Sequence, residues 1–113
     1  MYAYDMMLMS KKSMNAVWSW DHCFNALTMA KVSRRIAMEQ FTAPFLLQTK
    51  KGILPDMWNP GIETMWGITK PPIHGWCFSK LMDQLAFEAE ELKAVYQYLE
   101  KWTGWWKIFV QIF

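Results

Sequence analysis

The sequence predicts an all-α fold in which two long helices pack as an antiparallel hairpin or a small bundle. Three observations support this prediction. Residues 1–43 contain neither Gly nor Pro, residues 44–77 are punctuated by both, and residues 78–113 carry an apolar heptad pattern. At 113 residues the chain is expected to form one domain, consisting of an N-terminal helical segment, an ordered linker and a C-terminal helix.

The N-terminal segment, residues 1–43, is rich in the helix formers Met, Ala, Leu, Lys and Arg. We expect one long helix, or two nearly collinear helices, that end before Pro44, because the residue before a proline is pushed out of the α region. Apolar residues occur on more than one face of this helix. Such a helix is usually covered on more than one side, so the pattern indicates packing partners.

The linker, residues 44–77, has too much Gly and Pro for a long regular element, although a short helical turn is expected over residues 62–66. Trp58, Trp66 and Trp76 recur through it and are expected to pin it across the helices or onto a neighbour. Segments rich in aromatic residues are rarely disordered.

The C-terminal helix is predicted from a seam of apolar residues at alternating steps of three and four. Ten of the eleven seam positions are apolar, and Glu88 is the exception. A repeat of 3.5 residues makes a helix bury its seam against a partner. Ser79 is the expected N-cap, and Gly104 predicts a kink, an end or a close helix approach. The seam consists of Phe78, Leu81, Leu85, Glu88, Leu92, Val95, Leu99, Trp102, Trp106, Phe109 and Phe113.

The composition indicates surplus apolar surface. The chain has eight Trp, ten Met and seven Phe but only 19% charged residues, and a helical domain of this size would not hide all of these side chains. The net charge of +2 selects no partner, although residues 1–51 carry +4 and residues 52–113 carry −2. This balance makes nucleic acid an unexpected partner.

The two Cys and two His residues are the candidates for chemistry. Cys23 and Cys77, with His22 and His74, could in principle make a tetrahedral zinc site or a thiolate–imidazole pair. Adjacent helical residues point about 100° apart, so His22 and Cys23 do not converge on one ion. No phosphate-binding loop or serine elbow is present, and we predict neither an enzyme nor a cofactor or metal.

The predicted interaction surface therefore consists of aromatic and aliphatic residues, most of them near the C-terminus. Protein subunits, a second copy of the chain, or a membrane surface are the expected partners. Lys31, Arg34 and Arg35 form a basic cluster that is a candidate contact for anionic lipid headgroups, and otherwise a solvated helix face. The surface comprises Trp58, Trp66, Trp76, Trp102, Trp105, Trp106, Ile108, Phe109, Ile112 and Phe113.

These observations predict a small accessory or structural subunit of a larger, membrane-associated assembly. The alternative is a peripheral protein that coats a membrane, lipid or polyester surface, and a small Cys-dependent enzyme is the third. In its long amphipathic helix rich in Ser, Lys, Met and Ala, the N-terminal segment resembles the phasins, helical proteins that coat polyester granules, though no diagnostic motif is shared. Without a signal peptide or membrane span in the sequence, an intracellular location, organellar or peripheral to a membrane, is expected.

Overall fold

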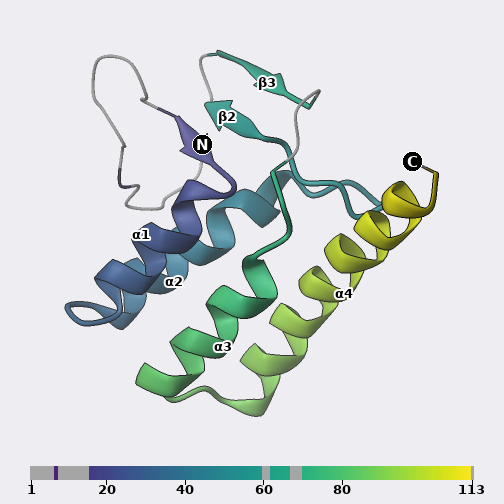
Figure 1. Ribbon diagram of the computed structural model, residues 1–113. Helices are drawn as coiled ribbons and strands as arrows, with labels where there is room; N and C mark the ends of the chain where they lie inside the picture. The colour runs from purple at the N-terminus through teal and green to yellow at the C-terminus, as the bar shows by residue number, and fades with distance from the viewer. Residues whose placement is uncertain (1–6, 8–15, 60–61, 67–69, 113) are drawn as a thin grey trace.

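The described part of the chain combines four α-helices, a short 3₁₀ helix and a small antiparallel sheet. The computed structural model describes residues 7, 16–59, 62–66 and 70–112 (Figure 1). Along the chain the elements are β1 (Val17–Trp18), α1 (Asp21–Met29), α2 (Arg34–Thr42), η1 (Ala43–Leu47), β2 (Met57–Asn59), β3 (Ile62–Met65), α3 (His74–Gln84) and α4 (Ala89–Ile112).

The sheet has the order β1-β2-β3, and both pairs of strands are antiparallel. β1 pairs with β2 through Val17 opposite Trp58 and Trp18 opposite Met57. The side chains of Val17 and Trp58 are buried, and with Ala43 they form a small apolar cluster that fixes the sheet to the start of η1. The sheet therefore sits over the ends of the helices rather than along them (Figure 1).

The prediction of an all-α hairpin of two long helices is wrong. In the described residues, two helices stand in place of each expected one: α1 and α2, and α3 and α4 (Figure 1). Residues 1–6 and 8–15 of the expected N-terminal helix lie outside the described residues. The sheet, for which the sequence pattern gives no signal, is also part of the described fold.

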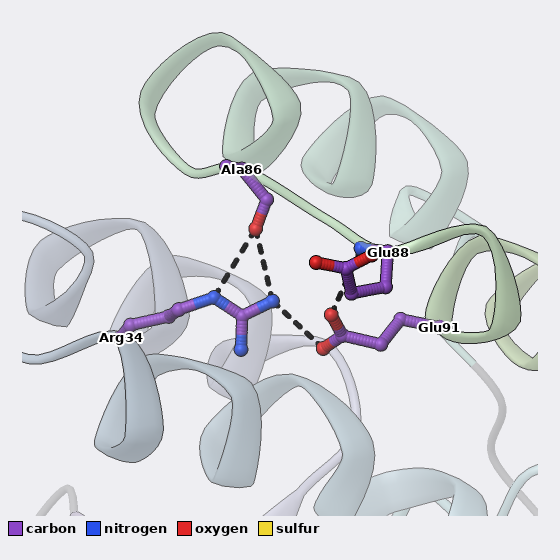
Figure 2. Close-up of polar contacts among 4 residues, drawn as sticks. All are labelled: Arg34, Ala86, Glu88 and Glu91. Carbon is purple, nitrogen blue, oxygen red and sulfur yellow. Dashed lines mark hydrogen bonds and ion pairs between the residues drawn. The ribbon is translucent and has the colours of Figure 1, made fainter.

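Glu88, the polar interruption of the heptad seam, marks where the predicted C-terminal helix divides. α3 ends at Gln84, and Glu88 precedes the first residue of α4. The backbone N–H of Glu88 donates to Glu91 Oε1 at 3.0 Å, so Glu91 caps the start of α4 in the manner of a capping box (Figure 2). This N–H and the guanidinium of Arg34 lower the pKa of Glu91.

Arg34 ties the start of α2 to this break between α3 and α4. Its Nε and one terminal nitrogen donate to the carbonyl oxygen of Ala86 at 3.2 and 3.0 Å, and the same terminal nitrogen lies 2.7 Å from Glu91 Oε2 (Figure 2). The guanidinium also lies 4.9 Å from the ring centre of Phe87. The turn is thus held by several directional contacts from the start of α2.

The N-terminal segment divides for a similar reason. After α1 ends at Met29, Ser33 adopts an extended conformation, and its side chain accepts a hydrogen bond from the backbone N–H of Ile36 at 3.2 Å. This is the geometry of a serine N-cap, which begins a new helix. The expected helix end before Pro44 is confirmed, because α2 stops at Thr42 and Pro44 lies in the first turn of η1.

Two further expectations for the linker and the last helix are wrong. Residues 62–66 contribute strand β3 rather than a helical turn, and α3 begins at His74 rather than at a cap on Ser79. The hydroxyl of Ser79 instead donates to the carbonyl oxygen of Trp76 within α3.

The main core lies where α1, α2, α3 and α4 meet. Large side chains from different elements touch there: the ring centres of Phe41 and Phe78 are 5.3 Å apart, and those of Phe45 and Tyr98 are 5.3 Å apart. Its buried members are Cys23, Ala26, Phe41, Phe45, Leu54, Cys77, Phe78, Leu81, Val95 and Trp102.

Gly52 and Gly104 differ in how much space surrounds them. Gly52 has a φ of 100°, and a Cβ built on it would overlap the backbone carbonyl of Lys101. Gly104, by contrast, lies inside the continuous helix α4 with open space around it. The helix neither ends nor meets another element at Gly104, so those two expectations are wrong, and the expected kink stays a prediction.

The substitution Gly52→Ala should therefore reduce the free energy of unfolding by about 2–4 kcal/mol. Alanine is strained at a positive φ, and its Cβ would clash with the backbone carbonyl of Lys101 in α4. The matched control, Gly104→Ala, should raise it by up to about 1 kcal/mol. Urea unfolding followed by circular dichroism measures both. Equal effects of the two substitutions would contradict the observed close approach at Gly52.

Candidate functional site

The turn between β1 and α1 is joined to the segment before β2 through Ser19. The backbone N–H of Ser19 donates to the carbonyl oxygen of Asp56 at 3.1 Å, and its hydroxyl donates to the carbonyl oxygen of Pro55. The backbone N–H of Asp56 in turn donates to the carbonyl oxygen of Met65 at 2.8 Å. Segments nearly forty residues apart are thereby held at the sheet end of the helices.

This junction brings the segments that carry two carboxylates to the same edge of the molecule. Asp21 is the first residue of α1, two positions after Ser19, and its side chain is half-buried. Asp56 is only 4% exposed, and its Oδ1 lies 3.4 Å from the Nζ of Lys70. A buried carboxylate is costly unless a cation or hydrogen bonds compensate for lost water, and Lys70 supplies that charge here.

Three residues next to Ser19 and Asp21 in the chain carry buried polar atoms without a hydrogen-bond partner in the described structure. These atoms are Nε1 of Trp18 and Trp20, and Nε2 of His22. The Nδ1 of His22 meets the backbone of Trp18, at 3.2 Å from its nitrogen and 3.1 Å from its oxygen, which leaves Nε2 as the unused ring atom. Buried polar groups are nearly always hydrogen-bonded in proteins, so these three nitrogens are exceptions among the described residues.

His74 connects the junction to the far side of the core. Its Nε2 lies 3.0 Å from the carbonyl oxygen of Ser19, and its Nδ1 lies 2.9 Å from Nε1 of Trp102. A carbonyl oxygen only accepts and an indole N–H only donates, so Nε2 carries the proton and Nδ1 is bare. The imidazole is therefore neutral, and burial lowers the pKa of His74 to about 4.

The two cysteines lie in the same core but are poor nucleophiles. Both are buried and neither forms a disulfide. The thiol of Cys77 contacts the carbonyl oxygen of Cys23 at 3.3 Å, which joins α3 to α1. A hydrogen bond with Cys77 together with burial raises the pKa of the Cys23 thiol. The thiolate needed for nucleophilic catalysis is disfavoured.

The Cys and His side chains of the described residues do not form a metal site. Within the part of the chain that the structure describes, no group of three or more His, Cys, Asp or Glu side chains converges as a metal centre. His22 and His74 use ring nitrogens for contacts to backbone and Trp102 instead.

The predicted interaction residues are divided between the core and the surface. Trp102 and Trp58 are buried, and Trp105 and Trp106 are half-buried against the main core. Trp66, Trp76 and Ile108 are exposed, by 41%, 49% and 61%. The side chains of Phe109 and Ile112, and Phe113 as a whole, lie outside the described residues. Whether the exposed members contact a partner stays a prediction.

The basic cluster is also divided. Arg34 is engaged at the α3–α4 turn, and Arg35 pairs with Glu39, one helical turn further along α2, at 2.8 Å. Lys31 lies apart from both and lines a cleft between α1 and α3. A role for these three residues in binding anionic lipid stays a prediction.

Several residues of the junction are missed by reasoning from sequence. His22 and His74 attract notice only as metal or thiol partners, whereas Ser19, Asp56 and Lys70 do not stand out. The sequence signal for them is weak: Asp56 is an acidic residue between Pro55 and an apolar pair in a segment rich in Gly and Pro. Nothing in its local pattern shows that it pairs with a region almost forty residues earlier.

Comparison with the models of known protein families assigns this chain to a family. The family model of the mannosylglycerate hydrolase MGH1-like glycoside hydrolase domain matches residues 14–108. Because this match covers most of the chain, the protein belongs to that glycoside hydrolase family. No curated protein and no solved structure gives a significant match.

This membership corrects the functional predictions. The interpretation as a small accessory or structural subunit is wrong, as are its alternatives of a coat for membrane, lipid or polyester surfaces and a Cys-dependent enzyme. The prediction that the chain is not an enzyme is also wrong, because the family is one of hydrolases. The apolar surface that suggested an assembly subunit belongs to a hydrolase-related fold.

Among the described helices, none has both the length and the apolar character needed to cross a membrane.

The protonation state of His74 predicts how stability depends on pH. Unfolding restores the ordinary His pKa of 6.5 from about 4, so the unfolded chain binds more protons between these values. The free energy of unfolding should therefore fall as the pH drops from 7 to 4, by about 3 kcal/mol from this residue. Denaturant titrations across this range measure the slope.

The variant His74→Gln is the control, because glutamine is polar but does not titrate. Its stability should be lower at pH 7, since Ser19 and Trp102 lose their shared partner, but it should depend less on pH. Some dependence of stability on pH should remain from His22, because burial also lowers the pKa of its side chain. An unchanged slope in the variant would show that His74 is not the titrating group.

Proposed function

We propose that this chain forms the carboxylate-bearing edge of a glycoside hydrolase site, with Asp21 as the catalytic carboxyl group. The observation that carries the proposal is that the hydrogen bonds of Ser19 hold the Asp56 segment against the turn that leads into Asp21. Family membership supplies the reaction class, the hydrolysis of a glycosidic bond.

The chemistry of that reaction fits these residue types. Most glycoside hydrolases use two carboxyl groups, of which one protonates the leaving oxygen and the other acts as base or nucleophile. Asp21 is the more accessible of the two carboxylates at this edge and begins a helix, which fixes its backbone. We assign it the proton transfer to the glycosidic oxygen, because a proton donor must reach within hydrogen-bond distance of that atom.

Asp56 is assigned a positioning role. Its side chain is almost fully buried and ion-paired with Lys70, so its reach toward a substrate is limited. Its backbone, however, holds Ser19 and hence the turn that leads into Asp21.

The substitution Asp21→Asn tests the assignment. With mannosylglycerate as substrate, kcat/KM should fall by about 10²- to 10⁴-fold, the usual contribution of general acid catalysis. With a dinitrophenyl glycoside, whose leaving group needs no protonation, most of the activity should remain. Rates are measured by release of glycerate and of dinitrophenolate.

Asp83→Asn is the matched control, because Asp83 lies exposed on α3 far along the helix from this junction. It should leave both rates unchanged. The proposal fails if the wild-type chain neither binds nor hydrolyses these glycosides, or if Asp21→Asn behaves like Asp83→Asn.

A further inference from the structure

A cleft between α1 and α3 lies outside the carboxylate edge. Its volume is about 480 Å³, which is within the range of sites that bind small molecules. The cleft is lined by Leu27, Thr28 and Lys31 from α1 and the turn after it, and by Trp76, Lys80 and Gln84 from α3.

The two helices run in the same direction along this cleft. His74 at the start of α3 contacts Ser19 just before α1, and Cys77 contacts Cys23 further along. Thr28 follows Asp21 by seven residues and Lys80 follows His74 by six. At 1.5 Å per residue, the cleft is centred about 10 Å along the helices from the carboxylate edge.

The cleft offers an aromatic surface at the end that lies nearer to Asp21. Trp76 is 49% exposed, and its ring centre lies 6.2 Å from that of Phe24, which in turn lies 4.8 Å from that of Trp20. The faces of aromatic rings carry negative charge density, which attracts the weakly positive C–H bonds of a sugar ring. The row of rings runs from the candidate catalytic edge to the cleft.

The polar lining is cationic and lacks a negative counterpart. Lys31 and Lys80 form no ion pair with any described residue, and the lining contains no acidic side chain. The hydroxyl of Thr28 donates to the carbonyl oxygen of Phe24 at 3.0 Å, so its lone pairs remain available as acceptors. With the amide of Gln84, the lining combines donors, acceptors and two positive charges.

We propose that this cleft binds an acidic saccharide, with a sugar ring on the indole of Trp76 and a carboxylate between the ammonium groups of Lys31 and Lys80. An anionic group would relieve the repulsion between two lysines that share one cleft, and charge-assisted hydrogen bonds are the stronger kind. Hydroxyl groups of the saccharide pair with Thr28 and Gln84. The site stands independently of the catalytic role assigned to Asp21.

Calorimetric titration with a mannuronate trisaccharide and with neutral mannotriose of the same linkage tests the proposal. The wild-type chain should bind the mannuronate trisaccharide, more weakly as salt is added, and should bind mannotriose at least about tenfold less tightly. The double variant Lys31→Ala/Lys80→Ala and the variant Trp76→Ala should each lose about tenfold or more in affinity for the acidic ligand.

Two control variants show whether the saccharide binds at this cleft or elsewhere on the chain. Lys93→Ala removes an exposed lysine from α4 and should leave binding unchanged. Asp21→Asn should lower kcat/KM for mannosylglycerate by about 10²- to 10⁴-fold without changing affinity at the cleft, so the two proposals fail separately.

The proposal is overturned if the wild-type chain does not bind the mannuronate trisaccharide, if mannotriose binds equally well, or if the cleft variants behave like Lys93→Ala. It is also overturned if Lys80→Glu converts an oligomer into a monomer in sedimentation velocity without affecting saccharide binding. In that case the cleft is an interface with a second copy of the chain.

Discussion

The structure depends on one buried histidine that joins three parts of the chain. His74 donates to the backbone of Ser19 before α1 and accepts from Trp102 on α4, while its own backbone begins α3. Its ring also packs edge-on against Phe45 of η1, with centres 5.4 Å apart. A neutral imidazole suits this place because it offers one donor and one acceptor on opposite sides of a flat ring. An apolar residue there would leave both polar partners buried and unpaired, which is costly.

The same contact organises the candidate site. By holding the carbonyl of Ser19, His74 fixes the turn from which α1 and Asp21 begin, and the other hydrogen bonds of Ser19 bring the segment around Asp56 to that turn. The core thus positions the carboxylate edge through backbone atoms. Catalytic groups gain from such rigid support, since small displacements of a reacting group reduce the rate strongly. The cleft beside Trp76 uses α1 and α3 as well, but further along both helices.

The errors of prediction from sequence have specific physical causes. Part of the heptad pattern does mark buried positions, since Phe78, Leu81, Val95 and Trp102 lie in one core, whereas Leu92 is exposed. Periodicity does not distinguish one long helix from two helices that present apolar faces to the same core. Glu88, the one polar position of the seam, is the local signal of the break between the two helices. The side chain of Glu91 caps the start of the second helix by accepting a hydrogen bond from the backbone N–H of Glu88. The strands were missed because two to four residues are too few to display an alternating pattern.

The sequence by itself determined the helical character of most of the chain, the helix end before Pro44, and the surplus of aromatic side chains. These properties follow from local preferences and composition, which any segment expresses without its neighbours. Only the tertiary structure decided which residues form a site. The segments of Asp21 and Asp56 meet through hydrogen bonds of Ser19, and His74 takes its partners from distant parts of the chain. Such pairings arise between segments far apart in the chain, so no periodicity or spacing in the sequence records them.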